Sequence, residues 1–173
     1  MNFEGYDALT LNAGEYEILM TLHRFSEVYK VEYGVAARDT WVSDYFTDHL
    51  SNSVHIPKEI LAMNDVSLYH SHTNETLLSV QDLRLLLNPR ISKIAVITPD
   101  CNICAASVKT GYRPDETEFT CISNRIQAEA GMELFDRFSF DGLSILERNA
   151  LAINECAYRI ARYFEWKIEG GGL

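Results

Sequence analysis

The residues with the clearest capacity for chemistry stand close together at His70-Ser71-His72, followed by Ser79 and Asp82. In an extended strand successive side chains alternate between the two faces, so His70 and His72 point to the same side. Neutral imidazoles at that spacing are good transition-metal ligands, and a carboxylate from the next element, such as Asp82, can supply a third. Because three protein ligands leave a coordination position open for water, the pattern indicates a catalytic zinc site, with Zn²⁺ as the cofactor.

The same residues also have a purely structural interpretation. Ser79-Val80-Gln81-Asp82 fits the start of a helix, in which the serine caps the backbone and the acid reaches back. Two histidines on a strand also occur as ordinary polar surface groups. The pattern by itself therefore leaves metal ligation and helix capping as alternatives.

The elements around these residues follow from hydrophobic periodicity. Residues 66–72 read as a strand whose even-numbered members share one face with the two histidines. A turn then leads into a helix over about 79–87, which must stop before Pro89. The histidines would thus lie at the end of a strand, and Ser79 and Asp82 at the start of the next helix.

The chain before this region predicts a helix and two strands. Apolar residues spaced by four, three and four positions predict an amphipathic helix over 14–29. Alternation predicts a strand over 30–36 that carries a lone carboxylate, Glu32, among small neighbours. A second strand over 40–46 and a polar loop over 47–53 follow.

The chain after this region predicts a hairpin and then helices. Residues 91–98 and 103–109 read as paired strands joined by a turn at 99–102, and a less regular stretch covers 116–138. From Leu143 to Phe164 apolar residues alternate spacings of three and four, which predicts a long helix with one apolar seam. The seam is expected to pack on the domain's own sheet, and the alternative is a homodimer through this C-terminal helix.

Length and composition bound the fold class and the partners. At 173 residues, with 47% hydrophobic and 23% charged residues, the chain predicts one globular domain over 1–173 of the α/β or α+β class. The net charge of −10 argues against a nucleic-acid partner. The apolar runs are too short to span a membrane, and the N-terminus lacks a secretory pattern, so the expected location is the cytoplasm.

The four cysteines predict reduced thiols and no disulfide framework. Cys101 and Cys104 have the spacing of a zinc or redox pair, but there is one such pair and it straddles the predicted hairpin, which favours a structural role. Cys121 and Cys156 fall in the helical last third and are expected to pack as small apolar groups.

Two further features receive structural interpretations. His23, His49 and His55 show no partner pattern and are expected to be surface or satisfied histidines. The glycine-rich end, residues 169–173, invites comparison with a Gly-Gly processing signal, but a flexible terminus is the expected state.

The motif resembles the signature of the JAMM (JAB or MPN-plus) metalloproteases. That signature is His-x-His-Pro, a spacer and Ser-x-x-Asp, preceded by a distant glutamate. His70 and His72 match the pair, Ser79 and Asp82 match the second half, and Glu32 lies 38 positions before His70. The order of elements from 14 to 109 follows the family's, while Thr73 replaces the usual proline and the spacer is one residue shorter than expected.

The resemblance implies a fold and a mechanism. It implies a JAB/MPN-like sheet flanked by helices over about 14–110, with a helical C-terminal extension over about 115–166. It also implies that His70, His72 and Asp82 hold Zn²⁺, that Glu32 takes a proton from the attacking water, and that Ser79 hydrogen-bonds the oxyanion. The substrate would be a protein or peptide, cleaved at a peptide or isopeptide bond.

Two other functions stay open. The sequence around Glu32 resembles bacterial and phage JAB-like domains more than eukaryotic deubiquitinases. Thr73 and the short spacer favour a rival interpretation, a catalytically inactive JAB-fold module that binds a protein partner without metal. A third possibility is the same zinc chemistry on a non-peptide amide or nucleotide-derived substrate, since the motif specifies water activation and not the pocket.

Overall fold

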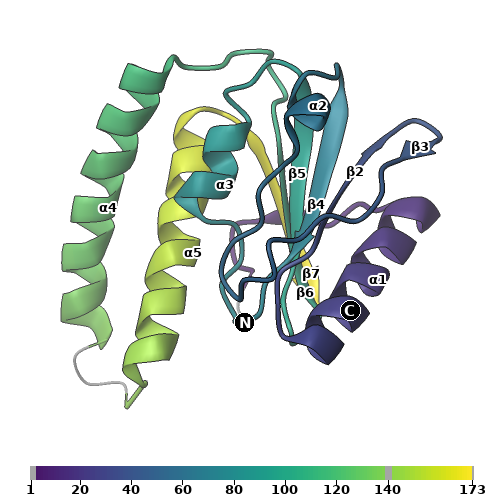
Figure 1. Cartoon of the computed structure of the whole chain (residues 1–173). Coiled ribbons are helices and arrows are strands. Elements are labelled where there is room, and N and C mark those ends of the chain that lie inside the picture. Colours follow the sequence, from purple (N-terminus) through teal and green to yellow (C-terminus); the bar gives the residue numbers. More distant parts are fainter. Residues whose placement is uncertain (1–2, 139–141, 173) are drawn as a thin grey trace.

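A seven-stranded mixed sheet runs through the molecule, with strand order β1-β7-β6-β5-β4-β2-β3 (Figure 1). The structure is a computed structural model that describes residues 3–138 and 142–172. The strands are β1 (Asp7–Ala8), β2 (Gly34–Arg38), β3 (Trp41–Val42), β4 (Val66–Ser71), β5 (Ile91–Ile97), β6 (Asn102–Ser107) and β7 (Lys167–Gly172). The β4–β5 and β1–β7 pairs are parallel and the other neighbours are antiparallel.

Helices cover both faces of this sheet (Figure 1). Helix α1 (Ala13–Tyr29) packs on one face, against β4 and β5. On the other face lie α3 (Val80–Leu85) and α5 (Ile145–Tyr163), with α4 (Glu116–Phe138) packed outside α5 and the short α2 (Lys58–Leu61) near the top. The predicted mixed α/β class is confirmed at this level.

The sheet separates two apolar cores, and the alternation along β4 shows how. Leu68 packs with Ile94 in the core beneath α3 and α5, whereas the next residue, Tyr69, packs with Leu19 and Leu22 of α1. The predicted sharing of a face by the even-numbered residues of 66–72 is therefore confirmed. His70 follows Leu68 on the α3 side of the sheet.

The start of the chain agrees with the predicted helix and differs at the strand after it. Asn12 caps α1 in a capping box with Glu15, and Lys30 ends the helix in the left-handed region at φ 55°. The prediction of a strand over 30–36 was wrong at its beginning, because β2 starts at Gly34. Glu32 therefore precedes the strand, and its backbone N–H donates a hydrogen bond to the Leu50 carbonyl at 2.9 Å.

The predicted second strand over 40–46 is shorter in the structure. β3 comprises only Trp41 and Val42, and Phe46 instead makes an isolated bridge to Gly34. A side chain at Gly34 would collide with the Phe46 ring, so glycine allows this close approach. The polar stretch over 47–53 is a loop, as expected.

The last third is helical as expected, with one correction at its end. The stretch 116–138, whose apolar pattern is less regular, is the helix α4, whose buried residues Phe119, Ile126 and Ala130 recur at spacings of seven and four on one stripe. The residues 169–172, expected to form a flexible end, belong to β7, which pairs with both β1 and β6. Leu173 lies outside the described residues.

The seam of the predicted C-terminal helix faces the molecule's own core. Ala157, Ile160 and Ala161 of α5 are buried in the cluster that includes the sheet residues Val96 and Ile168. This confirms the expected packing within the chain. A homodimer through this helix stays a prediction.

All four cysteines are free thiols, as expected. Cys101 stands at φ 56° in the turn between β5 and β6, and Cys104 is buried in β6. Cys156 packs as a buried apolar group, but Cys121 is exposed, so the expectation for that residue was wrong. No helix within residues 3–138 and 142–172 has the length and apolar character needed to cross a bilayer.

Candidate metal centre

The candidate ligands meet where a β4-α3-β5 unit places the carboxyl end of a strand beside the start of a helix. His70 lies in β4, and His72 follows its last residue, where its backbone N–H is still held by the Ile97 carbonyl at 2.9 Å. α3 connects β4 to the parallel strand β5, and Asp82 lies in its first turn. The carboxyl ends of parallel strands are a common place for ligand sites in α/β proteins.

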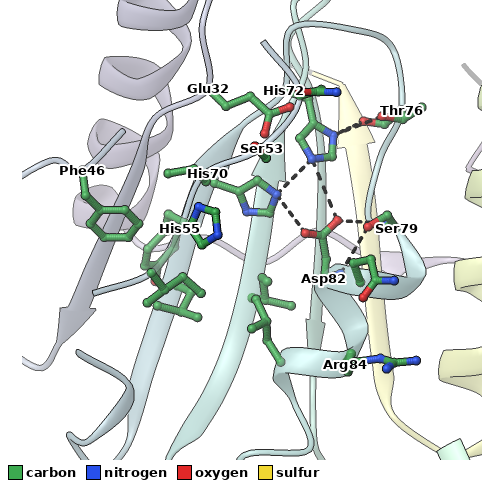
Figure 2. Close-up of a pocket in the computed structure, with 18 of the residues that line it drawn as sticks. Glu32, Phe46, Ser53, His55, His70, His72, Thr76, Ser79, Asp82 and Arg84 are labelled. Atoms are coloured by element: carbon green, nitrogen blue, oxygen red, sulfur yellow. Dashed lines mark hydrogen bonds and ion pairs between the residues drawn. The ribbon is translucent and has the colours of Figure 1, made fainter. Parts of the chain in front are cut away.

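Three side chains converge there (Figure 2). The Nε2 atoms of His70 and His72 are 3.0 Å apart. A carboxylate oxygen of Asp82 lies 3.2 Å from His70 Nε2, and the other lies 3.9 Å from His72 Nε2. The structure thus brings together the three predicted metal ligands, which form a group capable of holding a metal ion.

The separations suit a small tetrahedral cation. Zinc–nitrogen and zinc–oxygen bonds of about 2.0–2.1 Å in tetrahedral geometry place two ligand atoms about 3.3 Å apart. The three observed separations of 3.0, 3.2 and 3.9 Å lie on both sides of that value. Two imidazoles and one carboxylate are also the donor set found at several catalytic zinc sites.

A backbone carbonyl fixes the tautomer of His72. Its Nδ1 lies 2.6 Å from the carbonyl oxygen of Thr76. A carbonyl can only accept a hydrogen bond, so Nδ1 must donate, and in the neutral ring the lone pair is then on Nε2, which faces the other ligands. Such outer contacts commonly orient metal-binding histidines.

The helix cap orients Asp82. The Ser79 N–H donates to one carboxylate oxygen of Asp82 at 2.7 Å, and the Asp82 N–H donates to the Ser79 hydroxyl oxygen at 3.2 Å. This is a complete capping box, so the structural interpretation of the Ser-x-x-Asp pattern is confirmed. It does not exclude the chemical one, because capping uses a lone pair of the Ser79 oxygen and leaves its hydrogen free to donate.

The charges of the ligands follow from burial and proximity. Burial, together with the neighbouring His70, lowers the pKa of His72 to about 4. Burial by itself would raise the pKa of Asp82, but the two histidines and the Ser79 N–H hold it well below its usual range. Burial also opposes ionisation of His70, but Asp82 and Glu32 keep its pKa raised. Near neutral pH His72 is uncharged and Asp82 ionised, the forms that bind a metal.

Glu32 reaches the same pocket from the turn before β2 (Figure 2). Its backbone is fixed on both sides, since its carbonyl accepts from the Thr47 hydroxyl at 2.7 Å and the Tyr33 N–H donates to the Ser71 hydroxyl at 3.1 Å. The side chain is buried, and this burial raises its pKa to about 7. A carboxyl group with that pKa can accept and return a proton near neutral pH.

The two departures from the JAMM pattern have visible structural roles. The short spacer still lets Asp82 reach His70, with a carboxylate oxygen 3.2 Å from His70 Nε2. The same spacer supplies the Thr76 carbonyl that contacts His72. Thr73, at the usual proline position, donates its hydroxyl to the Ser51 carbonyl. This bond holds the loop over 47–53, which contains Ser51, beside the site.

His55, expected to be a surface or satisfied histidine, is exposed and also lines the pocket. Its Nδ1 lies 2.6 Å from Asp48, and the same carboxylate oxygen accepts from the His55 N–H at 2.6 Å. Sequence reasoning missed this pair because six residues of irregular loop lie between its members. The periodicity of helices and strands contains no signal for such a contact.

The pocket has a volume of about 640 Å³ and two chemically different ends. The titratable end carries Glu32, His70, His72 and Asp82, with Ser79 beside them. The remainder of its lining is largely apolar and comes from the sheet, from α2 and α3, and from the loop over 46–56. A group of potential ligands and a potential base therefore open onto a space large enough for a ligand.

Comparison with known proteins adds no relative. No protein-family model, curated protein or solved structure matches the chain.

Proposed function

We propose that the protein is a zinc-dependent hydrolase that cleaves a peptide or isopeptide bond. The observation that carries the proposal is the convergence of His70, His72 and Asp82 in a pocket that also contains the buried Glu32. The resemblance of these residues to the JAMM signature supports the choice of bond. The proposed partner is accordingly a protein or peptide substrate.

The roles of the side chains follow from their positions. His70, His72 and Asp82 would hold the ion, and zinc bound there would polarise a carbonyl group and lower the pKa of a bound water. Glu32 accepts the proton of the attacking water and returns it to the leaving amine, a use that fits its pKa of about 7. The Ser79 hydroxyl donates a hydrogen bond to the oxygen that becomes negative as the carbonyl is attacked.

The first test is metal content together with peptide turnover. Wild type should bind about one equivalent of zinc, as expected for one three-ligand site, and cleave members of a mixed peptide library in a way that chelation abolishes. His72→Ala should lose both zinc and cleavage. His23→Ala is the matched control, because His23 bonds the Pro99 carbonyl at 2.9 Å away from this site and should keep both.

A metal-free binding module is the rival function, and one observation favours it. His70 and Asp82 already form an ion pair at 3.2 Å, so the cluster has internal partners without a cation. Wild-type protein that stays free of zinc when titrated with it would support the rival and overturn the hydrolase. Zinc binding without cleavage of any peptide would leave the metal centre in place and refute the proposed reaction.

A further inference from the structure

The apolar end of the pocket is built by the same elements that supply the candidate ligands. Its large side chains are Phe46, Ile56, Leu61, Leu68, Leu85 and Ile94. Leu68 and Ile94 belong to the buried core and form a fixed floor, while the other four are partly buried at its walls. This arrangement gives the pocket a preformed apolar compartment directly beside the candidate centre.

The sheet register sets how far that floor lies from the centre. Leu68 stands two residues before His70 on the same face of β4, and Ile94 is its register partner on β5. Two residues along a strand advance about 6.6 Å. The floor therefore begins one side chain's length from the ligands, the distance expected for the residue next to a bond being cleaved.

Helix α3 also carries an apolar pocket residue close to a candidate ligand, on the wall that faces the sheet. Leu85 lies three residues after Asp82, and residues at that spacing lie on the same side of a helix. Phe46 forms another wall of the compartment. Its ring lies against the backbone of Gly34, which is two residues after Glu32. The side chains that flank the compartment thus neighbour, along the chain, the residues with proposed chemical roles.

We infer that this compartment binds one large apolar side chain, such as leucine, methionine or phenylalanine, of the residue flanking the scissile bond. The inference rests on the proposed function and narrows its substrate class. The whole pocket, with a volume of about 640 Å³, lies within the roughly 300–1,000 Å³ typical of ligand pockets, so it has room for a large side chain in the compartment and for adjoining backbone at the ligands. A substrate with glycine or alanine there would leave the apolar walls uncovered.

The charged residue at the far end of the compartment is already paired. Arg84 lines the pocket, but its guanidinium bonds Glu116 at 2.6 Å and lies 5.6 Å from the centre of the Phe119 ring. Of the other titratable groups in the lining, His55 is paired with Asp48, and the rest, namely Glu32, His70, His72 and Asp82, lie at the proposed reaction centre. A side chain entering the compartment therefore meets hydrocarbon, which disfavours acidic and basic residues because their charges would lose hydration.

The test compares zinc-loaded protein on a peptide series that varies one residue beside the cleaved bond among glycine, alanine, leucine and phenylalanine. One methylene in an apolar pocket changes specificity by about 10- to 200-fold, so kcat/KM should be at least about 100-fold higher for leucine and phenylalanine than for glycine. Equal cleavage of all four peptides would overturn the inference and leave the hydrolase intact.

Two substitutions change the compartment in opposite directions. Leu61→Phe narrows it and should lower kcat/KM for the phenylalanine peptide more than for the alanine peptide. Phe46→Ala widens it and should shift the preference toward still larger side chains, such as naphthylalanine. Leu146→Phe is the control for added volume, since Leu146 is 80% exposed on α5, and it should leave the preference unchanged.

A binding measurement tests the compartment without turnover. Labelled peptides of the same series are titrated against Glu32→Gln protein by fluorescence anisotropy, and leucine and phenylalanine peptides should bind at least about 10-fold more tightly than the glycine peptide. If cleavage fails for every peptide but this preference is found, the proposed reaction is wrong and the compartment stands. Equal binding of all peptides refutes the compartment, whatever the outcome of the zinc measurements.

Discussion

Two polar clusters lie on opposite faces of the same sheet, and they differ in how their charges are balanced. On the α1 side, one oxygen of Glu15 accepts hydrogen bonds from Lys93 at 2.6 Å and from Tyr69 at 2.8 Å, and the other accepts from the Asn12 N–H at 2.9 Å. On the α3 side, His70, His72 and Asp82 converge beside Glu32. Tyr69 and His70 are adjacent in β4, so a single strand contributes to both clusters.

The Glu15 cluster contains its own cation, Lys93. Within residues 3–138 and 142–172, no lysine or arginine forms an ion pair with Asp82 or Glu32. The ion pairs of Asp82 are with the two histidines, one of which is kept neutral by burial near neutral pH. The carboxyl pKa values reflect this difference. Burial opposes ionisation of Glu15, but Lys93, Asn12 and Tyr69 lower its pKa, whereas burial raises the pKa of Glu32 to about 7. A fully paired carboxylate is typical of an interaction that stabilises the fold. Potential metal ligands that converge beside a carboxyl group with a raised pKa are typical of a functional site.

The same substitution in both clusters should have the largest difference in effect. Glu32→Gln should keep bound zinc and lower the rate of peptide cleavage by about 10²- to 10⁴-fold, the usual contribution of a general base. Glu15→Gln should leave the rate unchanged. The measurement is initial rates together with zinc content by elemental analysis, and a Glu32→Gln enzyme with full activity would remove Glu32 from the mechanism.

A second pair of variants separates capping from chemistry at Ser79. Ser79 and Ser144 form matching capping boxes, each accepting from the third helical N–H at 3.2 Å. Loss of either cap should destabilise the protein by about 1 kcal/mol. Only Ser79→Ala should also lower kcat, by about 10²- to 10³-fold, since only Ser79 lines the pocket.

These effects are read from urea unfolding and from initial rates on the same preparations. A Ser79→Ala enzyme whose rate matches that of Ser144→Ala would show that Ser79 acts as a helix cap alone.

The Glu15 cluster should contribute to the free energy of unfolding, and this contribution should depend on pH. Glu15→Gln removes a half-buried ion pair and should lower the free energy of unfolding by about 2 kcal/mol at pH 7. Because folding lowers the pKa of Glu15 below its ordinary value of 4.5, its stabilisation is present above pH 4.5 and is lost as the pH falls further. The difference between wild type and Glu15→Gln should therefore shrink from pH 7 to pH 3, and a difference independent of pH would contradict the assignment.

The last expected effect has the opposite sign and belongs to Glu32 in metal-free protein. Folding raises the pKa of Glu32 from 4.5 to about 7, so the folded state holds a proton that the unfolded state releases between these values. Glu32→Gln should accordingly be more stable than wild type by up to about 3 kcal/mol at pH 8, because each pKa unit corresponds to about 1.4 kcal/mol, and the two should converge below pH 4.5. Urea unfolding in the presence of a chelator measures this, and equal stability at pH 8 would mean that the charge of Glu32 is not buried.

Local sequence specifies several parts of the candidate site because they depend on short-range geometry. The two-residue period of a strand puts His70 and His72 on one side, and the Ser79–Asp82 spacing starts α3 with a capping box. The helical period likewise locates α1 and α5 within a few residues. Each of these signals lies within one turn or a few residues of the structure it predicts.

Other parts depend on contacts between distant segments, which periodicity does not contain. Glu32 lies in a turn held by the Leu50 carbonyl, and the glycine-rich segment 167–172, a poor strand former by composition, becomes a strand because β1 and β6 pair with it. Gly170 packs against the Phe3 and Tyr6 rings in a space that a side chain would fill. Tertiary structure alone likewise assembled the apolar compartment, since its walls come from β4, β5, α2, α3 and a loop whose order in the chain says nothing about their distance from His70.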